Sequence, residues 1–133
     1  MTPAARLQAA IDLLDTVLGD ARPADGTIAA YFRGRKFFGA KDRRAVADQV
    51  WRILRHRARL SWALGTDAPS GRLLVAADLA TAEKKNIDAI AGLYSGAKNG
   101  PHPFAANERR LVAQATARNL ADAPREMKLE MPD

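Results

Sequence analysis

Hydrophobic residues recur every three or four positions through most of this chain, which is the pattern of amphipathic helices. The first stripe begins after Thr2 and Pro3, a pair that favours a helix start, and stops at Gly19, a residue that favours a helix end. A second stripe runs from about Pro23 to Arg33. No segment alternates polar and apolar residues as a strand does. The pattern therefore predicts an all-α fold.

The longest predicted helix runs from about Lys41 to Leu64. At 100° per residue its apolar positions share an arc about 120° wide, and its charged positions share an opposite arc about 80° wide. The apolar set is Val46, Val50, Ile53, Leu54, Leu60 and Leu64. The charged set is Lys41, Arg44, Asp48, Arg52, Arg55 and Arg59. We therefore expect this helix at the centre of the bundle, with its cations on one outer face.

Three shorter helices are predicted after Gly65, beginning near Ser70, Ile87 and Asn107. Asn107 is expected to cap the last of them, with Glu108 in its first turn and Leu120 on its apolar side. The residues 125–133 have no helical period and are expected to form a linker. The residues 1–124 are then one helical domain, which is ordinary for this length.

Arg57 falls in the middle of the apolar arc of the long helix, although its side chain stays charged. Burial there would require a carboxylate partner, and Asp12 or Asp15 on the first helix would serve. Alternatively, the side chain extends past the core to water. The sequence leaves both alternatives open.

Four aromatic residues lie near the cations. Trp51 and Trp62 project beside the basic arc, where they would either stack on unpaired bases or pack against neighbouring helices, and we favour packing. Phe37 and Phe38 precede the long helix in a turn, and both are expected to dock on the core.

Positive charge is concentrated between residues 33 and 59. This segment holds ten of the 21 Lys and Arg residues and only two acids, so it carries +8 in a chain of net charge +6. Such a cluster is typical of a surface that binds nucleic acid, although a solvated Arg-rich helix shows the same composition. The residues predicted to contact phosphate are Arg33, Arg35, Lys36, Lys41, Arg44, Arg52, Arg55 and Arg59.

Side chains that carry catalysis are scarce. The chain has no cysteine, and His56 and His102 have no partner at metal-ligand spacing. No glycine-rich phosphate loop or nucleophile elbow is present. We expect neither a catalytic site nor a metal site. The sequence also shows no secretory signal and no apolar run long enough for a membrane span, so we expect a cytoplasmic protein.

Several short motifs occur in a fixed order. They are Arg22-Pro23-Ala24-Asp25, Ala30-Tyr31-Phe32-Arg33, Lys41-Asp42-Arg43-Arg44 and the run from Leu54 to Trp62. In this order they resemble the NusB-like domain at the amino terminus of bacterial 16S rRNA cytosine-C5 methyltransferases, the RsmB or Sun family. Weaker similarity continues through Arg72-Leu73-Leu74 and Ala106-Asn107-Glu108-Arg109, so the resemblance covers most of the chain.

The resemblance implies a bundle of about six helices that binds RNA, joined to a carboxy-terminal Rossmann-like domain. That second domain uses S-adenosylmethionine and paired cysteines. Without a cysteine this chain lacks the nucleophile that methylation at cytosine C5 requires. We therefore expect a non-catalytic, monomeric fragment without a cofactor of its own. Its expected partners are rRNA and its own methyltransferase domain, toward which residues 131–133 would lead.

Other classes of function remain open at this point. A free-standing NusB-type antitermination factor would bind RNA and a ribosomal protein. A helical interaction module would use the basic face to dock an acidic protein. A DNA-binding domain is less favoured, because the long helix has no short helix-turn-helix partner before it.

Overall fold

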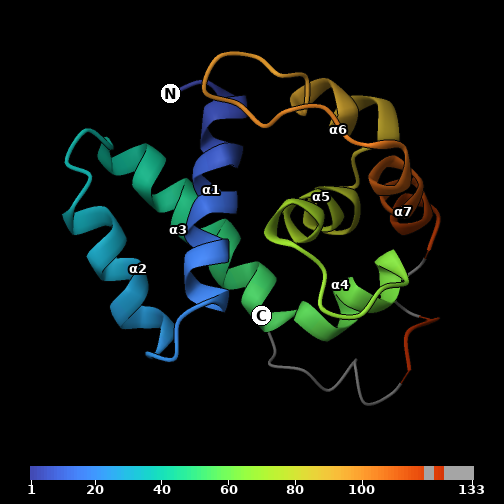
Figure 1. Ribbon diagram of the computed structural model, residues 1–133, viewed down its shortest axis with the longest axis horizontal. Coiled ribbons are helices and arrows are strands. Elements are labelled where there is room, and N and C mark those ends of the chain that lie inside the picture. The colour runs from blue at the N-terminus through green and yellow to red at the C-terminus, as the bar shows by residue number, and fades with distance from the viewer. Residues whose placement is uncertain (119–121, 125–133) are drawn as a thin grey trace.

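The structure is a computed structural model that describes residues 1–118 and 122–124. Within these residues it has seven helices and no strand, which confirms the all-α prediction (Figure 1). The helices are α1 (Pro3–Leu18), α2 (Ala24–Arg33), α3 (Ala40–Arg55), α4 (Arg57–Leu64), α5 (Gly71–Thr81), α6 (Ile87–Leu93) and α7 (Ala106–Ala117). The predicted linker at 125–133 and Leu120 lie outside the described residues.

Three of the helices begin at polar side chains that accept a backbone hydrogen bond, as helix caps do. Thr2 Oγ1 accepts from the Ala5 N–H at 3.1 Å and begins α1. Ser70 Oγ accepts from Leu73 at 3.3 Å and begins α5, while Asn86 Oδ1 accepts from Ala89 at 2.8 Å and begins α6.

The predicted cap at Asn107 is wrong. α7 begins at Ala106 and has Ala105 at its cap position. The Ala105 N–H donates to Glu108 Oε1 at 2.9 Å, so a side chain of the first turn reaches back to the backbone. Arg72 on α5 holds the same carboxylate, which fixes this earlier start.

The single long helix predicted for residues 41–64 is also wrong, because the structure breaks it at His56 into α3 and α4. The His56 N–H turns back to Ile53 O at 3.1 Å, and Leu60 N–H restarts the helix from His56 O at 2.9 Å. An unbroken helix of that length would extend about 36 Å. The break instead lets α3 pack on α1 while α4 packs on α5 and α7.

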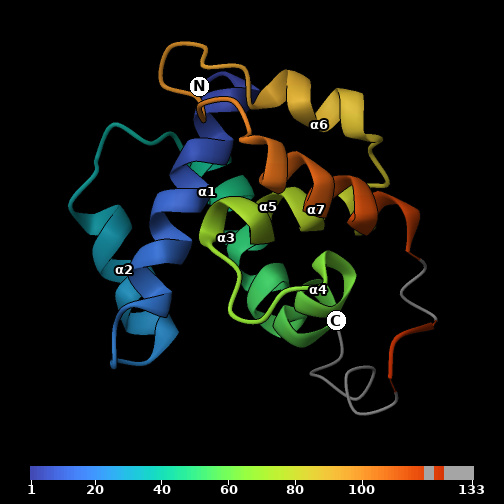
Figure 2. The same cartoon turned by 45° about the vertical axis from the view of Figure 1, so that its right-hand side comes forward.

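The central helix of the bundle is therefore α5, not the segment 41–64. α5 contacts α1, α3, α4, α6 and α7, and every residue from Leu74 to Ala80 is buried. In Figures 1 and 2 the helices α1, α2 and α3 lie on one side of α5, and α4, α6 and α7 lie on the other. None of the helices in the described part of the chain is long and apolar enough to cross a membrane.

The questions left open for the long helix are resolved by this packing. Trp51 and Trp62 are half-buried against the core, which confirms the packing interpretation. Arg57 is exposed, so of the two alternatives the structure favours extension of its side chain to water over burial against Asp12 or Asp15. Because the break at His56 makes Arg57 the first residue of α4, the phase of an unbroken helix does not apply to it.

Candidate nucleic-acid interface

Six exposed cations gather around the connection between α2 and α3. We call this set the α2–α3 basic surface, and it consists of Arg33, Arg35, Lys36, Lys41, Arg43 and Arg44. α2 ends at Gly34, and two backbone hydrogen bonds fold the connection: Arg35 N–H to Phe32 O at 3.0 Å and Phe38 N–H to Arg35 O at 3.3 Å. α3 then begins at Ala40, so all six cations lie within a twelve-residue stretch of chain from Arg33 to Arg44.

A cluster of buried aromatic rings holds this connection against the bundle. Phe32 meets Tyr31 and Phe38 edge-on, in both cases with ring centroids 5.3 Å apart. Such edge-to-face pairs are a preferred geometry for aromatic packing. Because Phe38 anchors the connection to the core, the cations on either side of it are left facing solvent.

Two of the cations lie over these rings. The Arg35 guanidinium lies 3.9 Å from the Tyr31 ring centroid and donates to Tyr31 O at 3.2 Å. The Arg43 guanidinium lies 5.7 Å from the Phe32 centroid. Burial raises the pKa of Tyr31, so its ring stays neutral beneath Arg35. These contacts restrict the positions of the two guanidinium groups, but they leave both charges unneutralised.

The basic surface carries little compensating negative charge. The stretch from Arg33 to Arg44 contains one acid, Asp42. Its carboxylate forms an ion pair with Arg6 Nε on α1 at 3.2 Å. None of the six cations forms an ion pair with a carboxylate among residues 1–118 and 122–124. The surface is therefore available to an external anion.

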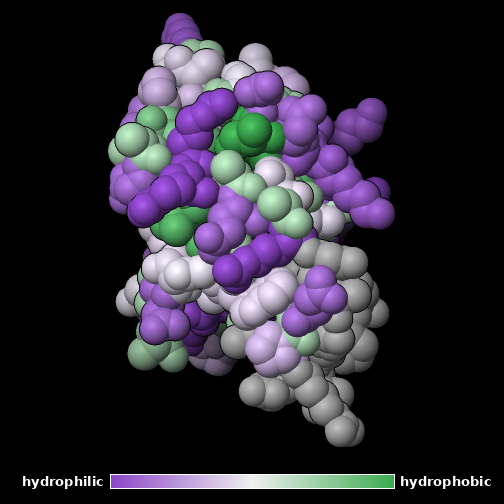
Figure 3. Space-filling model, turned by 90° about the vertical axis from the view of Figure 1, so that its right-hand side faces the viewer, coloured by the Kyte–Doolittle hydropathy of each residue, from purple (hydrophilic) through white to green (hydrophobic). Residues whose placement is uncertain are grey.

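The face formed by α6 and α7 is different. Figure 3 shows hydrophilic side chains there around small hydrophobic patches. Arg109 Nη2 pairs with Asp88 at 3.2 Å, and Arg72 Nη2 pairs with Glu108 at 3.1 Å. Two cations at this face are paired with acids, so it is a poorer candidate for binding a polyanion.

The structure brings five of the eight predicted contact residues together in the α2–α3 basic surface, namely Arg33, Arg35, Lys36, Lys41 and Arg44. The other three, Arg52, Arg55 and Arg59, lie farther along the chain. The rise of an α-helix places Arg55 about 17 Å from Arg44 along the α3 axis. That they contact phosphate stays a prediction, and their surroundings differ from those of the first five.

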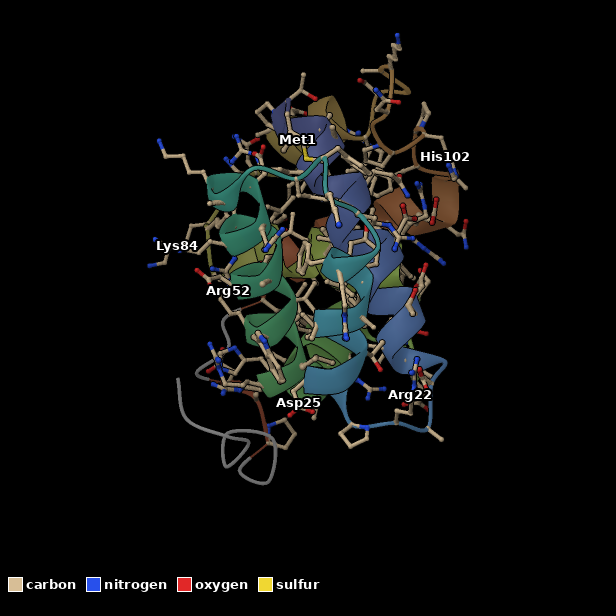
Figure 4. The ribbon with its side chains drawn as sticks, turned by 90° about the vertical axis from the view of Figure 1, so that its left-hand side faces the viewer. Met1, Arg22, Asp25, Arg52, Lys84 and His102 are labelled. Carbon is tan, nitrogen blue, oxygen red and sulfur yellow. The ribbon has the colours of Figure 1, made fainter. Side chains whose placement is uncertain are left out.

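Arg52 is half-buried and is paired with acids of the fold. Its Nε and Nη2 atoms donate to the two oxygens of Asp78 at 2.8 and 2.6 Å, and Nη2 also meets Glu83 at 3.2 Å. The hydrogen bonds that Arg52 donates to Asp78 raise the pKa of Arg52. Figure 4 shows Arg52 on the side of α3 toward Lys84. Because its guanidinium already neutralises a carboxylate, we leave it out of the proposed interface.

Arg55 and Arg59 are half-buried on either side of the break at His56. Arg55 Nε is buried and has no hydrogen-bond partner among the described residues. Arg59 belongs to α4, so it does not continue the row of cations on α3. These two arginines are therefore not an extension of the α2–α3 basic surface.

Two residues of this candidate interface were not identified from the sequence. Arg43 falls outside the basic arc of α3, but it lies beside Phe32 of α2. Phe37 is 75% exposed, so the prediction that both phenylalanines dock on the core is wrong for it. Phe38 occupies the core position, and Phe37 stacks on it with centroids 5.0 Å apart. The adjacent Phe-Phe pair was a usable signal, since two successive residues of a tight turn seldom both face inward.

The remaining chemistry is limited. In the part of the chain that the structure describes, no three His, Asp or Glu side chains come together as metal ligands. Comparisons with models of protein families, with curated proteins and with solved structures found no match.

Proposed function

We propose that this chain binds RNA through the α2–α3 basic surface. The observation that carries this proposal is the group of six exposed cations without a described carboxylate partner, next to an exposed aromatic side chain. Lys and Arg groups that neutralise phosphates release counterions, and this release supplies much of the affinity for nucleic acid. An exposed phenylalanine beside them offers a stacking surface for a base.

RNA fits this surface better than duplex DNA. Readers of the major groove present a row of side chains along a recognition helix. Beyond its first two turns, however, α3 presents Asp48 and the ion-paired Arg52. The unpaired cations lie mainly around a short connection, which suits the irregular backbone of single-stranded or looped RNA.

We also propose that the chain is the NusB-like accessory domain of a 16S rRNA cytosine-C5 methyltransferase. The ordered motifs from Arg22 to Trp62 support this assignment, and the all-α bundle is compatible with it. The chain would be a cytoplasmic, non-catalytic monomer that presents rRNA to the methyltransferase domain. Methyl transfer from S-adenosylmethionine would occur on that other domain, because this chain offers no cysteine nucleophile.

Fluorescence anisotropy tests the binding proposal. Labelled single-stranded RNA, stem-loop RNA and duplex DNA are titrated with the protein at two salt concentrations. We expect RNA to bind more tightly than DNA, and the affinity to fall as salt rises. Equal affinity for all three would reduce the claim to general electrostatics. No binding at low salt would favour a protein-interaction module.

The coding sequence that follows Asp133 tests the family proposal. A Pro-Cys motif and an S-adenosylmethionine-binding fold in the same reading frame would support it. A stop codon there would instead favour a free-standing NusB-type antitermination factor.

A further inference from the structure

An open groove lies beside the α2–α3 basic surface, between α1, the connection that carries Phe37, and the loop that joins α6 to α7. Its volume is about 780 Å³, within the range of small-molecule sites. Gln8 and Asp12 line it from α1, Arg35 and Phe37 from the connection, and Lys98 and Asn99 from the loop. Figure 4 shows Met1, another lining residue, beside the α2–α3 connection.

Close contacts between neighbouring elements hold the walls of this groove in place. At Gly100 the loop lies so close to α1 that a Cβ atom would be 2.8 Å from the Ala4 Cβ. Arg72 donates to His102 O at 3.1 Å and to Pro103 O at 3.3 Å, which fixes the far part of the loop. The groove is therefore largely formed before any ligand arrives.

Phe37 lines the groove and is the most exposed residue of the aromatic cluster formed by Tyr31, Phe32, Phe37 and Phe38. Its ring is stacked on Phe38 at an interplanar angle of 27°, while 75% of the residue is accessible. Full burial of a phenylalanine side chain is worth about 1.5–3 kcal/mol relative to exposure. A flat partner that covers this ring would therefore gain a substantial part of this free energy on binding.

Charge divides the groove into two zones. Arg35 and Lys98 contribute cations, and Lys36 lies next to Phe37 in the chain. On the α1 wall Gln8 Nε2 donates to Asp12 Oδ1 at 2.9 Å, which leaves the carboxylate and the amide facing the same space. A phosphate would be repelled by Asp12, whereas the amino edge of a base would be accepted. The occupant that matches both zones is a nucleotide with its base inward and its phosphates on the cations.

We propose that this groove holds one unpaired nucleobase of the bound RNA, stacked on Phe37. This inference rests on the proposed function and adds to it a reason for preferring single-stranded over duplex RNA. Base pairing hides the faces that stack on aromatic side chains, so a duplex would gain only the phosphate contacts.

The test compares Phe37 variants on two strands of about ten nucleotides, a length within known single-strand site sizes. One strand is ordinary single-stranded RNA, and the other has the same backbone with abasic positions throughout. We expect Phe37→Ala to weaken binding to the ordinary strand about 5- to 150-fold, which corresponds to a stacking free energy of about 1–3 kcal/mol, and to leave binding to the abasic strand unchanged. Phe37→Trp should retain affinity, and its emission should be quenched by the ordinary strand only.

The possible results distinguish failure of the base-stacking inference from failure of the proposed RNA binding. If the wild-type protein binds neither strand, the proposed RNA function fails. If it binds both strands and Phe37→Ala changes neither affinity, or weakens both equally, the base-stacking groove is overturned while RNA binding stands. Since Phe37 is mostly exposed, Phe37→Ala should keep the thermal midpoint of the wild-type protein, which circular dichroism checks.

Discussion

Arg52 on α3 and Asp78 on α5 form a bidentate ion pair between the two helices, with nitrogen–oxygen distances of 2.8 and 2.6 Å. The Asp78 side chain is only 2% exposed, and Gln49 donates to it as well at 3.3 Å. A buried carboxylate is costly unless it is paired and hydrogen-bonded. Arg52 thus satisfies the one acidic side chain in the central helix, rather than serving as an isolated surface cation.

Loss of Arg52 should therefore destabilise the fold. Arg52→Met leaves the Asp78 carboxylate buried with only Gln49 beside it, and breaking such a pair costs about 3 kcal/mol. Urea denaturation measures the change in the free energy of unfolding. Arg44→Met is the matched control on the same helix, since Arg44 is exposed and has no described ion pair, and it should change stability by less than about 0.5 kcal/mol.

The double variant Arg52→Met, Asp78→Leu shows whether the cost comes from the orphaned acid. An apolar pair of similar volume often restores or exceeds the stability of a buried ion pair. We expect the double variant to regain most of the stability lost in Arg52→Met. A double variant as unstable as the single one would mean that the packing of the Arg52 stem, not its charge, is what matters.

Gly71, the first residue of α5, should not tolerate a side chain. A Cβ atom there would lie 2.3 Å from Asp15 Oδ1, which now accepts the Gly71 N–H at 3.1 Å. We expect Gly71→Ala to lower stability by about 1–3 kcal/mol, as overpacking does. Gly92 in α6 is the control, because its Cβ would meet nothing within 4 Å, and Gly92→Ala should stabilise by about 0.5–1 kcal/mol. Thermal unfolding of both variants distinguishes them, and equal effects would contradict this packing.

The pair formed by Arg72 and Glu108 should make the free energy of unfolding depend on pH in the acidic range. Hydrogen bonds from Arg72 lower the pKa of Glu108, so the folded protein binds this proton less tightly than the unfolded chain. The stabilisation is complete above the ordinary value of about 4.3 and is lost as pH falls through the lowered pKa. Glu108→Gln should therefore cost about 1–2 kcal/mol at neutral pH and progressively less below about pH 4. Urea denaturation across this pH range measures the difference. A difference that does not change with pH would contradict the assignment.

Arg57 should be replaceable. Because it is exposed, Arg57→Met should change the free energy of unfolding by less than about 0.5 kcal/mol. A loss comparable to that of Arg52→Met would show that Arg57 is paired within the fold after all. The two substitutions are chemically identical and five residues apart in the sequence, so they form a direct comparison.

Local signals in the sequence predict much of this fold. Helices begin at Thr2 and Ser70 and end at Gly65. These signals can be read from the sequence because each residue acts on neighbours only a few positions away. The break at His56 is different, because no Gly or Pro marks it. It follows from the packing of α4 on α5 and α7, which depends on residues far along the chain.

The candidate site could be predicted only in part, for the same reason. Charge density locates the cations from Arg33 to Arg44, since they are close in sequence. Helical phase places Arg52 on the basic arc, but it does not show that Asp78 faces it from another helix. Nor does it show which of Phe37 and Phe38 enters the core, because only the three-dimensional packing of Tyr31 and Phe32 decides that.

The central claim is that the α2–α3 basic surface binds RNA, and two matched charge reversals test it most directly. Arg44 lies on this surface, whereas Arg110 is an exposed arginine on α7, on the other side of the bundle (Figure 1). Affinity for single-stranded RNA is measured by anisotropy at several salt concentrations. Arg44→Glu should weaken binding about tenfold or more and flatten the salt dependence, because a charge-assisted contact to phosphate is lost. Arg110→Glu should have little effect; equal losses for the two variants, or none for Arg44→Glu, would contradict the claim.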